Sequence, residues 1–229
     1  MKLEDVVPWG RSLEEYRLMF ALSEADLERK ILGCGDGPAS FNAELTLAGG
    51  NVVSIDPTYQ YNSGELGQRI DEVRCDLLAQ MNLNRENYVW DSISSVAELE
   101  SIRMRAMRTF LADFEEGKSA KRYQCQALPE LSFANQEFDL ALCSHFLFLY
   151  SEQVVLQTHL ASVLELSRVA KEVRIYPLLS LDGRESPHLT QVIATLCAHG
   201  NTVRLEHVDY EFQRGAREMM VVSSNQPQD

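Results

Sequence analysis

The chain has 229 residues, of which 45% are hydrophobic and 24% charged, and its formal net charge is −13 at pH 7. This length and balance predict one soluble globular domain spanning residues 1–229. So acidic a surface disfavours nucleic acid and anionic membranes as partners, because both repel a negatively charged protein. No apolar run reaches the roughly 20 residues that a membrane helix needs, and the acidic start MKLEDVVPWG lacks the apolar segment of a secretory signal.

The five cysteines are scattered and odd in number, and no two of them form a Cys-x-x-Cys pair. They are predicted to be reduced, mostly buried thiols of a cytoplasmic protein, and not a disulfide framework or a zinc site. His188, His199 and His207 are dispersed without metal-ligand spacing, so no metal site is expected.

The first predicted element is a helix that begins after Ser12, because Ser12 and Glu15 form a capping-box pattern. Ser23 and Asp26 repeat the pattern for a second, shorter helical turn. Apolar residues recur at helical spacing behind the first cap: Leu13, Tyr16, Met19 and Phe20.

A short strand, KILGCG, is expected next, followed by a turn with three glycines at alternate positions. The helix PASFNAELTLAGG is predicted to have Pro38 at its first position and to end at the pair 49–50. NVVSIDP is then predicted to be a buried strand that stops at Asp56.

Residues 58–122 do not fit the alternation of strands and helices and are predicted to form a helical insertion. In its second half Ser95 and Glu98 are predicted to form a capping box, and Gly117 to end the helix. The insertion is interpreted as a lid or substrate-selecting element, and extra core packing stays open as the alternative.

In the rest of the chain, predicted strands again alternate with predicted helices. FDLALCSHFLFLY and KEVRIYPLL are predicted strands, and VVLQTHLASVLELSRVA and SPHLTQVIATLCAHG are predicted helices. TVRLEHVDYEF and REMMVVSS are expected to be strands joined by QRGA, a link of hairpin length. This pattern predicts an α/β fold with a mostly parallel sheet, helices on both faces and an antiparallel last strand.

The glycine turn after the first strand has the features of a ligand site. Gly33, Gly35 and Gly37 would let polar atoms approach the main chain where backbone N–H groups meet a helix N-terminus. Asp56 follows Gly37 by nineteen residues, at the end of the next strand. A carboxylate there can accept hydrogen bonds from both hydroxyls of a ribose, so the pair indicates a nucleoside-bearing cofactor. Pro38 stands where a dinucleotide fingerprint has its last glycine.

LGCGDG, VVSIDP and ELSFANQEFDLALCSHFLFLY resemble the successive motifs of class I S-adenosylmethionine-dependent methyltransferases, and most closely those of the small-molecule type. The resemblance covers about residues 29–57 and 123–224. It implies a Rossmann-like seven-stranded, mostly parallel sheet with an antiparallel last strand, and S-adenosyl-L-methionine as the cofactor.

The resemblance also implies which residues bind the cofactor. Asp56 would bind the ribose hydroxyls, Pro57 would pack on the adenine, and Gln126 would stand where the family reads the adenine amino group. Ser144 and His145 would occupy the loop that faces cofactor and substrate. The complete implied set is Gly33, Cys34, Gly35, Gly37, Asp56, Pro57, Gln126, Ala127, Leu128 and Ser144.

Two departures from the family pattern stand out. The family has an acid two residues before its first motif glycine, where this chain has Ile31; whether Asp36 compensates is left open. The chain also has CSHF in place of the Asn/Asp-Pro-Pro-aromatic motif of exocyclic-amine methyltransferases, which disfavours DNA adenine methylation.

Methyl transfer from a sulfonium needs positioning, and it needs a base where the acceptor must lose a proton. His145 is the candidate base, because imidazole titrates near neutral pH, with a purely structural histidine as the alternative. The expected acceptor is a small, uncharged or cationic molecule. A non-catalytic S-adenosylmethionine-binding module and a nicotinamide-dependent oxidoreductase remain alternatives. Aromatic residues near the insertion are candidates for an acceptor pocket or for plain packing: Tyr59, Tyr61, Tyr88 and Trp90.

Overall fold

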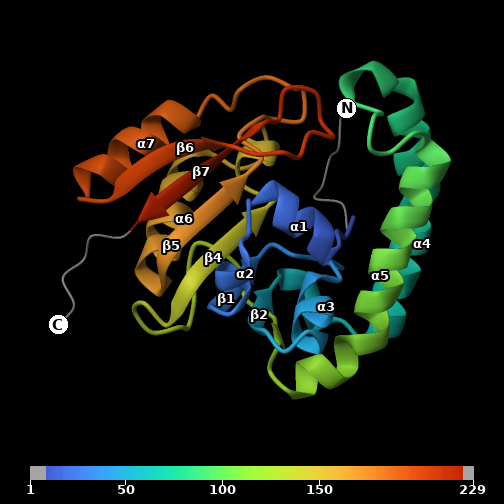
Figure 1. Ribbon diagram of the computed structural model, residues 1–229, viewed down its shortest axis with the longest axis horizontal. Helices are drawn as coiled ribbons and strands as arrows, with labels where there is room; N and C mark the ends of the chain where they lie inside the picture. The colour runs from blue at the N-terminus through green and yellow to red at the C-terminus, as the bar shows by residue number, and fades with distance from the viewer. Residues whose placement is uncertain (1–8, 224–229) are drawn as a thin grey trace.

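The structure, a computed structural model, describes residues 9–223. Its seven strands form one sheet in the order β3-β2-β1-β4-β5-β7-β6 (Figure 1). The strands β1 to β5 run parallel, and β7 lies antiparallel between β5 and β6. This confirms the predicted α/β fold and its antiparallel last strand. The strands are β1 (Lys30–Cys34), β2 (Asn51–Ile55), β3 (Tyr123–Gln124), β4 (Phe138–Ser144), β5 (Ala170–Tyr176), β6 (Thr202–His207) and β7 (Glu218–Ser223).

Helices cover both faces of the sheet. α1, α3 and α5 lie on one side, with α3 packed on β2 and α5, and α6 and α7 pack on β5 and β6 on the other side. The α-helices are α1 (Leu13–Met19), α2 (Glu24–Leu27), α3 (Phe41–Leu47), α4 (Ser63–Leu83), α5 (Val96–Ser119), α6 (Leu156–Val169) and α7 (Leu189–Ala198). Three short 3-10 turns follow strand or helix ends: η1 (Pro57–Gln60), η2 (Arg85–Asn87) and η3 (Phe148–Tyr150).

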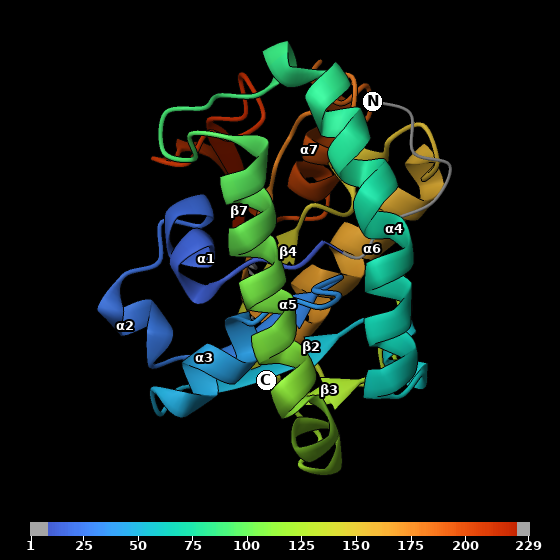
Figure 2. The same cartoon turned by 90° about the vertical axis from the view of Figure 1, so that its right-hand side faces the viewer.

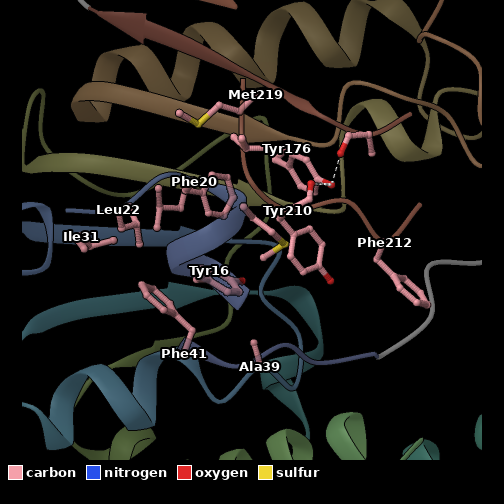
Figure 3. Close-up of a cluster of buried hydrophobic side chains, with 14 of the residues drawn as sticks. Tyr16, Phe20, Leu22, Ile31, Ala39, Phe41, Tyr176, Tyr210, Phe212 and Met219 are labelled. Atoms are coloured by element: carbon pink, nitrogen blue, oxygen red, sulfur yellow. Dashed lines mark hydrogen bonds between the residues drawn. The ribbon is translucent and has the colours of Figure 1, made fainter. Parts of the chain in front are cut away.

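The apolar core is split between the two faces of the sheet, as the alternation of side chains along a strand requires. In β4, Leu140 and Leu142 belong to the cluster under α1, whereas Ala141 and Cys143 belong to the cluster under α6 and α7. Figure 3 shows the cluster under α1, where aromatic side chains of α1, α3 and the β6–β7 link gather. Because both faces of β4 are covered, residues 140–143 of this strand are all apolar or cysteine and all buried.

The predicted insertion is a helical hairpin of α4 and α5, which lie side by side in Figure 2. Phe110 and Phe114 of α5 pack against Tyr59 and Tyr123 in a buried aromatic cluster, with stacked, tilted and edge-on ring contacts. Since this cluster continues the core at the β3 edge, α5 is held as a structural helix and α4 packs outside it. None of the helices within residues 9–223 is long and apolar enough to cross a membrane.

Several predicted element ends are confirmed and others are wrong. The capping boxes of Ser12 and Ser23 are present. α3 begins at Phe41 and not at Pro38, which lies in the preceding turn. At α5 only half of the predicted capping box forms, because the Glu98 carboxylate accepts the Ser94 N–H in place of the Ser95 N–H.

Gly117 does not end α5, which continues to Ser119. It serves close packing instead: a Cβ at this position would stand 2.4 Å from the Tyr123 ring. The predicted QRGA hairpin is also wrong, because β6 ends at His207 and the ten residues 208–217 connect it to β7.

The prediction of mostly buried thiols is wrong as well. Cys34 and Cys143 are buried within the sheet, whereas Cys75, Cys125 and Cys197 are exposed. The expectation about the chain's first residues falls on 1–8, outside the described part.

Candidate functional site

A cavity lies beyond the carboxyl ends of β1, β2 and β4, the edge at which ligands bind in open α/β sheets. Most of the residues predicted for the site meet there: Cys34, Gly35, Gly37, Asp56, Pro57, Gln126, Ala127, Leu128, Ser144 and His145. Gly33 is not among its lining residues. It lies inside β1, where a Cβ would stand 1.9 Å from the Asp36 carboxylate. We call this space the first cavity.

The glycine turn has a conformation that needs its glycines. Gly35 and Gly37 have φ angles of +67° and +51°, in the left-handed region that glycine adopts without strain. A Cβ on Gly37 would have no heavy atom nearer than Asp56 Oδ2 at 3.9 Å, so the space beside it is open. The Gly37 N–H donates to Asp56 Oδ2 at 3.0 Å, which joins the turn to the end of β2.

Asp56 is fixed by its own neighbours. Its Oδ1 accepts hydrogen bonds from the Thr58 N–H (2.8 Å) and the Thr58 hydroxyl (2.5 Å), because it caps η1. Burial raises the pKa of this carboxyl, and the hydrogen bonds from Thr58 and Gly37 oppose that shift. The carboxylate is therefore oriented before any ligand arrives, with acceptor capacity left at the cavity wall.

Asp36 lies close to the strand where the family has an acid and this chain has Ile31, and a role for it in binding the cofactor stays a prediction. Ile31 is fully buried in the core under α1 and does not line the cavity. The Asp36 carboxylate lies beside Gly33 and accepts hydrogen bonds from Tyr16 Oη (2.7 Å) and Ser54 Oγ (2.5 Å). Burial raises its pKa to about 7. An acid thus stands at this strand end, although it comes from the turn and not from the strand.

The loop after β3 forms the opposite wall. The Gln126 side chain is held on both sides, since Nε2 donates to Gln124 Oε1 (3.0 Å) and Oε1 accepts from the Ser132 N–H (2.8 Å). Leu128, with Pro57 from the other side of the cavity, supplies apolar surface. A reading role for Gln126 stays a prediction.

His145 follows the end of β4 with a φ of +51°, which is uncommon for a residue with a side chain. Its N–H donates to Tyr176 O (2.8 Å), and its Nδ1 lies 2.9 Å from Ser144 Oγ. Burial and the charges of Arg11 and Arg103 lower the pKa of His145 well below its usual value. The imidazole is therefore neutral at physiological pH.

A second cavity adjoins the first, and both are lined by Trp9, Arg11 and His145. The insertion and three loops at the same sheet edge supply the rest of its wall. Those residues are Leu77, Met81, Tyr88, Arg103, Leu149, Tyr150, Leu181, Phe212 and Gln213.

The four aromatic residues predicted as acceptor-pocket or packing residues lie in different parts of the structure. Tyr88 lines the second cavity, Tyr59 belongs to the buried cluster on α5, and Trp90 packs on Phe212. Tyr61 lies outside both cavities.

Sequence reasoning missed Trp9 and Arg11, because no motif contains them. The signal that was available is Gly10, where a Cβ would stand 2.0 Å from Pro38 O. This close approach, with the hydrogen bond from the Ser40 N–H to Arg11 O (3.0 Å), places the segment against the glycine turn. In residues 9–223 no group of acidic, cysteine and histidine side chains is arranged to hold a metal ion.

Three comparisons place the chain among known proteins. No family model matches it. It is 32% identical over 224 residues to the uncharacterized protein MJ0045 of Methanocaldococcus jannaschii, covering 97% of this chain and 98% of that protein. Among solved structures, it superposes on WbdD, a bifunctional kinase-methyltransferase, with a TM-score of 0.51 and 14% identity, covering 93% of this chain but 40% of WbdD.

A second structural match is the magnesium protoporphyrin IX methyltransferase ChlM of Synechocystis PCC 6803, solved with S-adenosylhomocysteine. The TM-score is 0.50 at 10% identity, and the match covers 93% of this chain and 81% of ChlM. With the strand order found above, these matches show a class I methyltransferase fold.

Proposed function

We propose that this chain, which belongs to the same family as protein MJ0045 of Methanocaldococcus jannaschii, binds S-adenosylmethionine and transfers its methyl group to a small molecule. The observation that carries the proposal is the meeting of two cavities at His145. One has the glycine turn and strand-end acid that a nucleoside-bearing cofactor needs, and the other provides room for an acceptor. The fold is that of ChlM, which was solved with bound S-adenosylhomocysteine, the demethylated form of this cofactor.

The residues of the first cavity fit such a cofactor. The open side of Gly37 allows close approach to the main chain, and Asp56 offers acceptors for two ribose hydroxyls. Pro57 and Leu128 would enclose the adenine. The Asp36 carboxyl would face the cationic methionine end.

The bound cofactor would supply a methyl group already activated by the sulfonium, so the protein's part is to orient the reactants and accept a proton. With Nδ1–H donating to Ser144 Oγ, the Nε2 of His145 carries the free lone pair and would accept the acceptor's proton.

The strand order supports this function over a nicotinamide-dependent oxidoreductase. A dinucleotide-binding sheet of the order 3-2-1-4-5-6 continues parallel past its fifth strand, whereas here β7 enters antiparallel between β5 and β6.

Calorimetry on Asp56→Asn tests the cofactor site. The substitution removes a charged acceptor from two ribose hydroxyls, so we expect the dissociation constant for S-adenosylhomocysteine to rise by about tenfold or more. Asp182→Asn, at an exposed carboxylate that does not line the site, is the matched control and should bind as the wild type does. Wild-type affinity in Asp56→Asn, or tighter binding of NAD than of S-adenosylhomocysteine, would overturn the proposal.

A further inference from the structure

The second cavity is lined by hydrogen-bond donors and carries no carboxylate. None of its lining residues within the described part is an aspartate or a glutamate. Three buried N–H groups of those residues have no acceptor within residues 9–223: Trp9 Nε1, Arg11 Nε and Arg103 Nε. Buried donors without acceptors are rare in folded proteins, so a cluster of three at one cavity indicates a missing acceptor.

The charges around this cavity do not balance either. Arg103 Nη1 donates to both carboxylate oxygens of Glu15, which also accepts from Tyr210 Oη at 2.9 Å. That carboxylate is therefore committed to Arg103. Arg11 donates through Nη1 to Trp9 O (2.8 Å) and forms no ion pair with any acid in residues 9–223. Among Glu15, Arg103 and Arg11, one positive charge is therefore left over beside the second cavity, whereas the carboxyls of Asp36 and Asp56 line only the first cavity.

Much of the remaining wall is apolar. Leu77 and Met81 of α4, Leu149, and Phe212 of the β6–β7 link supply this apolar part. A charge placed against such walls is unfavourable unless a ligand supplies the opposite charge. The apolar part of the wall therefore fits an apolar portion of a ligand, and the unpaired donors fit a single anionic group on that ligand.

We propose that the second cavity binds the methyl acceptor as a largely apolar molecule with one carboxylate, which pairs with Arg11 and accepts hydrogen bonds from Trp9 and Arg103. The proposal rests on the proposed function, because it assigns the substrate class of the same site. It replaces the expectation of an uncharged or cationic acceptor, which followed from the overall charge of the chain. The local charge at the cavity has the opposite sign.

Binding of such an anion would also affect the candidate base. The positive charge of Arg11 is one of the causes that lower the pKa of His145. A carboxylate next to Arg11 would offset that charge and make the imidazole a stronger base when the acceptor is in place. Arg11 would then act as a binding residue that also tunes His145.

The test compares benzoate and benzamide, which have nearly the same shape and differ in charge. Each is titrated into the protein, free and loaded with S-adenosylhomocysteine, for the wild type, Arg11→Met and the exposed control Arg204→Met. We expect benzoate to bind at least tenfold more tightly than benzamide. Arg11→Met should abolish this difference, and Arg204→Met should keep it. Equal affinity for the two probes, or binding of neither, would overturn the proposal.

The cofactor's own carboxylate is a competing partner for Arg11, because Arg11 lines both cavities. If Arg11→Met weakens S-adenosylhomocysteine binding tenfold while benzoate binding is unchanged, Arg11 serves the cofactor and the proposal fails. Failure of the proposed function looks different: S-adenosylhomocysteine would not bind the wild type, whereas benzoate could still be tested on the free protein.

The chain's own N-terminal acids are a second competitor. Glu4 and Asp5 precede the described residues in the sequence. The double variant Glu4→Gln, Asp5→Asn is expected to bind benzoate with wild-type affinity. A tenfold gain in benzoate affinity would show that an internal carboxylate pairs with Arg11, which would contradict an acceptor site.

Discussion

Asp36 is a buried carboxyl in a cavity that we assign to a cation. Its pKa of about 7 means that it is protonated in slightly acidic solution and ionised above neutrality. Since the folded state holds the proton more tightly than the unfolded chain, its contribution to stability is present below the unfolded pKa near 4 and is lost as the pH rises through 7. A bound cation would stabilise the ionised form.

We therefore expect the affinity for S-adenosylmethionine to increase between pH 6 and pH 7.5. The dissociation constant measured by calorimetry should fall in the wild type and stay nearly flat in Asp36→Asn, which keeps a similar side-chain shape next to Tyr16 and Ser54. A wild-type dissociation constant that does not change over this range would show that Asp36 is not in contact with the cation.

At the scale of elements, a buried polar network joins the insertion to α1 and to the β6–β7 link. Arg103 of α5, fully buried, pairs with Glu15 of α1, and both contact Tyr210 of the β6–β7 link. Removing one partner of a buried ion pair leaves the other charge uncompensated, which is far more costly than losing an exposed pair. The same network shapes the wall of the second cavity.

Glu15→Gln should therefore lower the free energy of unfolding by about 3–5 kcal/mol, measured by urea denaturation. The matched control is Glu100→Gln, at the partly exposed partner of Arg74 on the α4–α5 hairpin, for which a change within about 1 kcal/mol is expected. Equal effects in the two variants would mean that the Glu15–Arg103 pair does not anchor α5.

The α4–α5 hairpin also shows which interpretation of the insertion the packing favours. Phe110 and Phe114 tie α5 to the core, whereas Leu77 and Met81 of α4 and Tyr88 line the second cavity. The packing of α5 favours the interpretation as extra core packing, and under the proposed function α4 would also form a wall that selects the substrate. A closing lid requires less buried attachment than α5 has.

At the scale of the whole molecule, local patterns in the sequence were enough for the sheet and for most of the first cavity. Apolar residues that recur every two positions indicate strands, and those that recur about every 3.6 positions indicate helices. Gly37 and Asp56 follow the ends of two strands, which a parallel sheet brings together. Neither residue periodicity nor a strand-end position indicates from the sequence that Arg11 and Arg103 lie near each other. They meet because α1, α5 and the β6–β7 link pack together, and that depends on contacts between residues far apart in the chain.

The errors have the same origin. Pro38 was predicted to open α3 from its preference for a first helical position, but it lies in the turn that carries Gly37, where Gly10 packs closely against its carbonyl. Gly117 was predicted to end α5 from its low helix propensity, but the Tyr123 ring, next to it in space, requires a residue without a side chain. In both cases a contact with another part of the fold outweighs the local preference.

The most direct test of the account is transfer of a labelled methyl group from S-adenosylmethionine to a metabolite extract, with the wild type and His145→Ala compared. We expect label in the small-molecule fraction, a rate about a hundredfold lower in His145→Ala, and similar S-adenosylhomocysteine affinity in both. Because burial and nearby positive charges hold the pKa of His145 well below its usual value, the wild-type kcat/KM for the acceptor, measured at saturating S-adenosylmethionine, should be flat near pH 7 and fall only in more acidic solution. Tight cofactor binding without label in any small molecule, or a variant as fast as the wild type, would contradict the account.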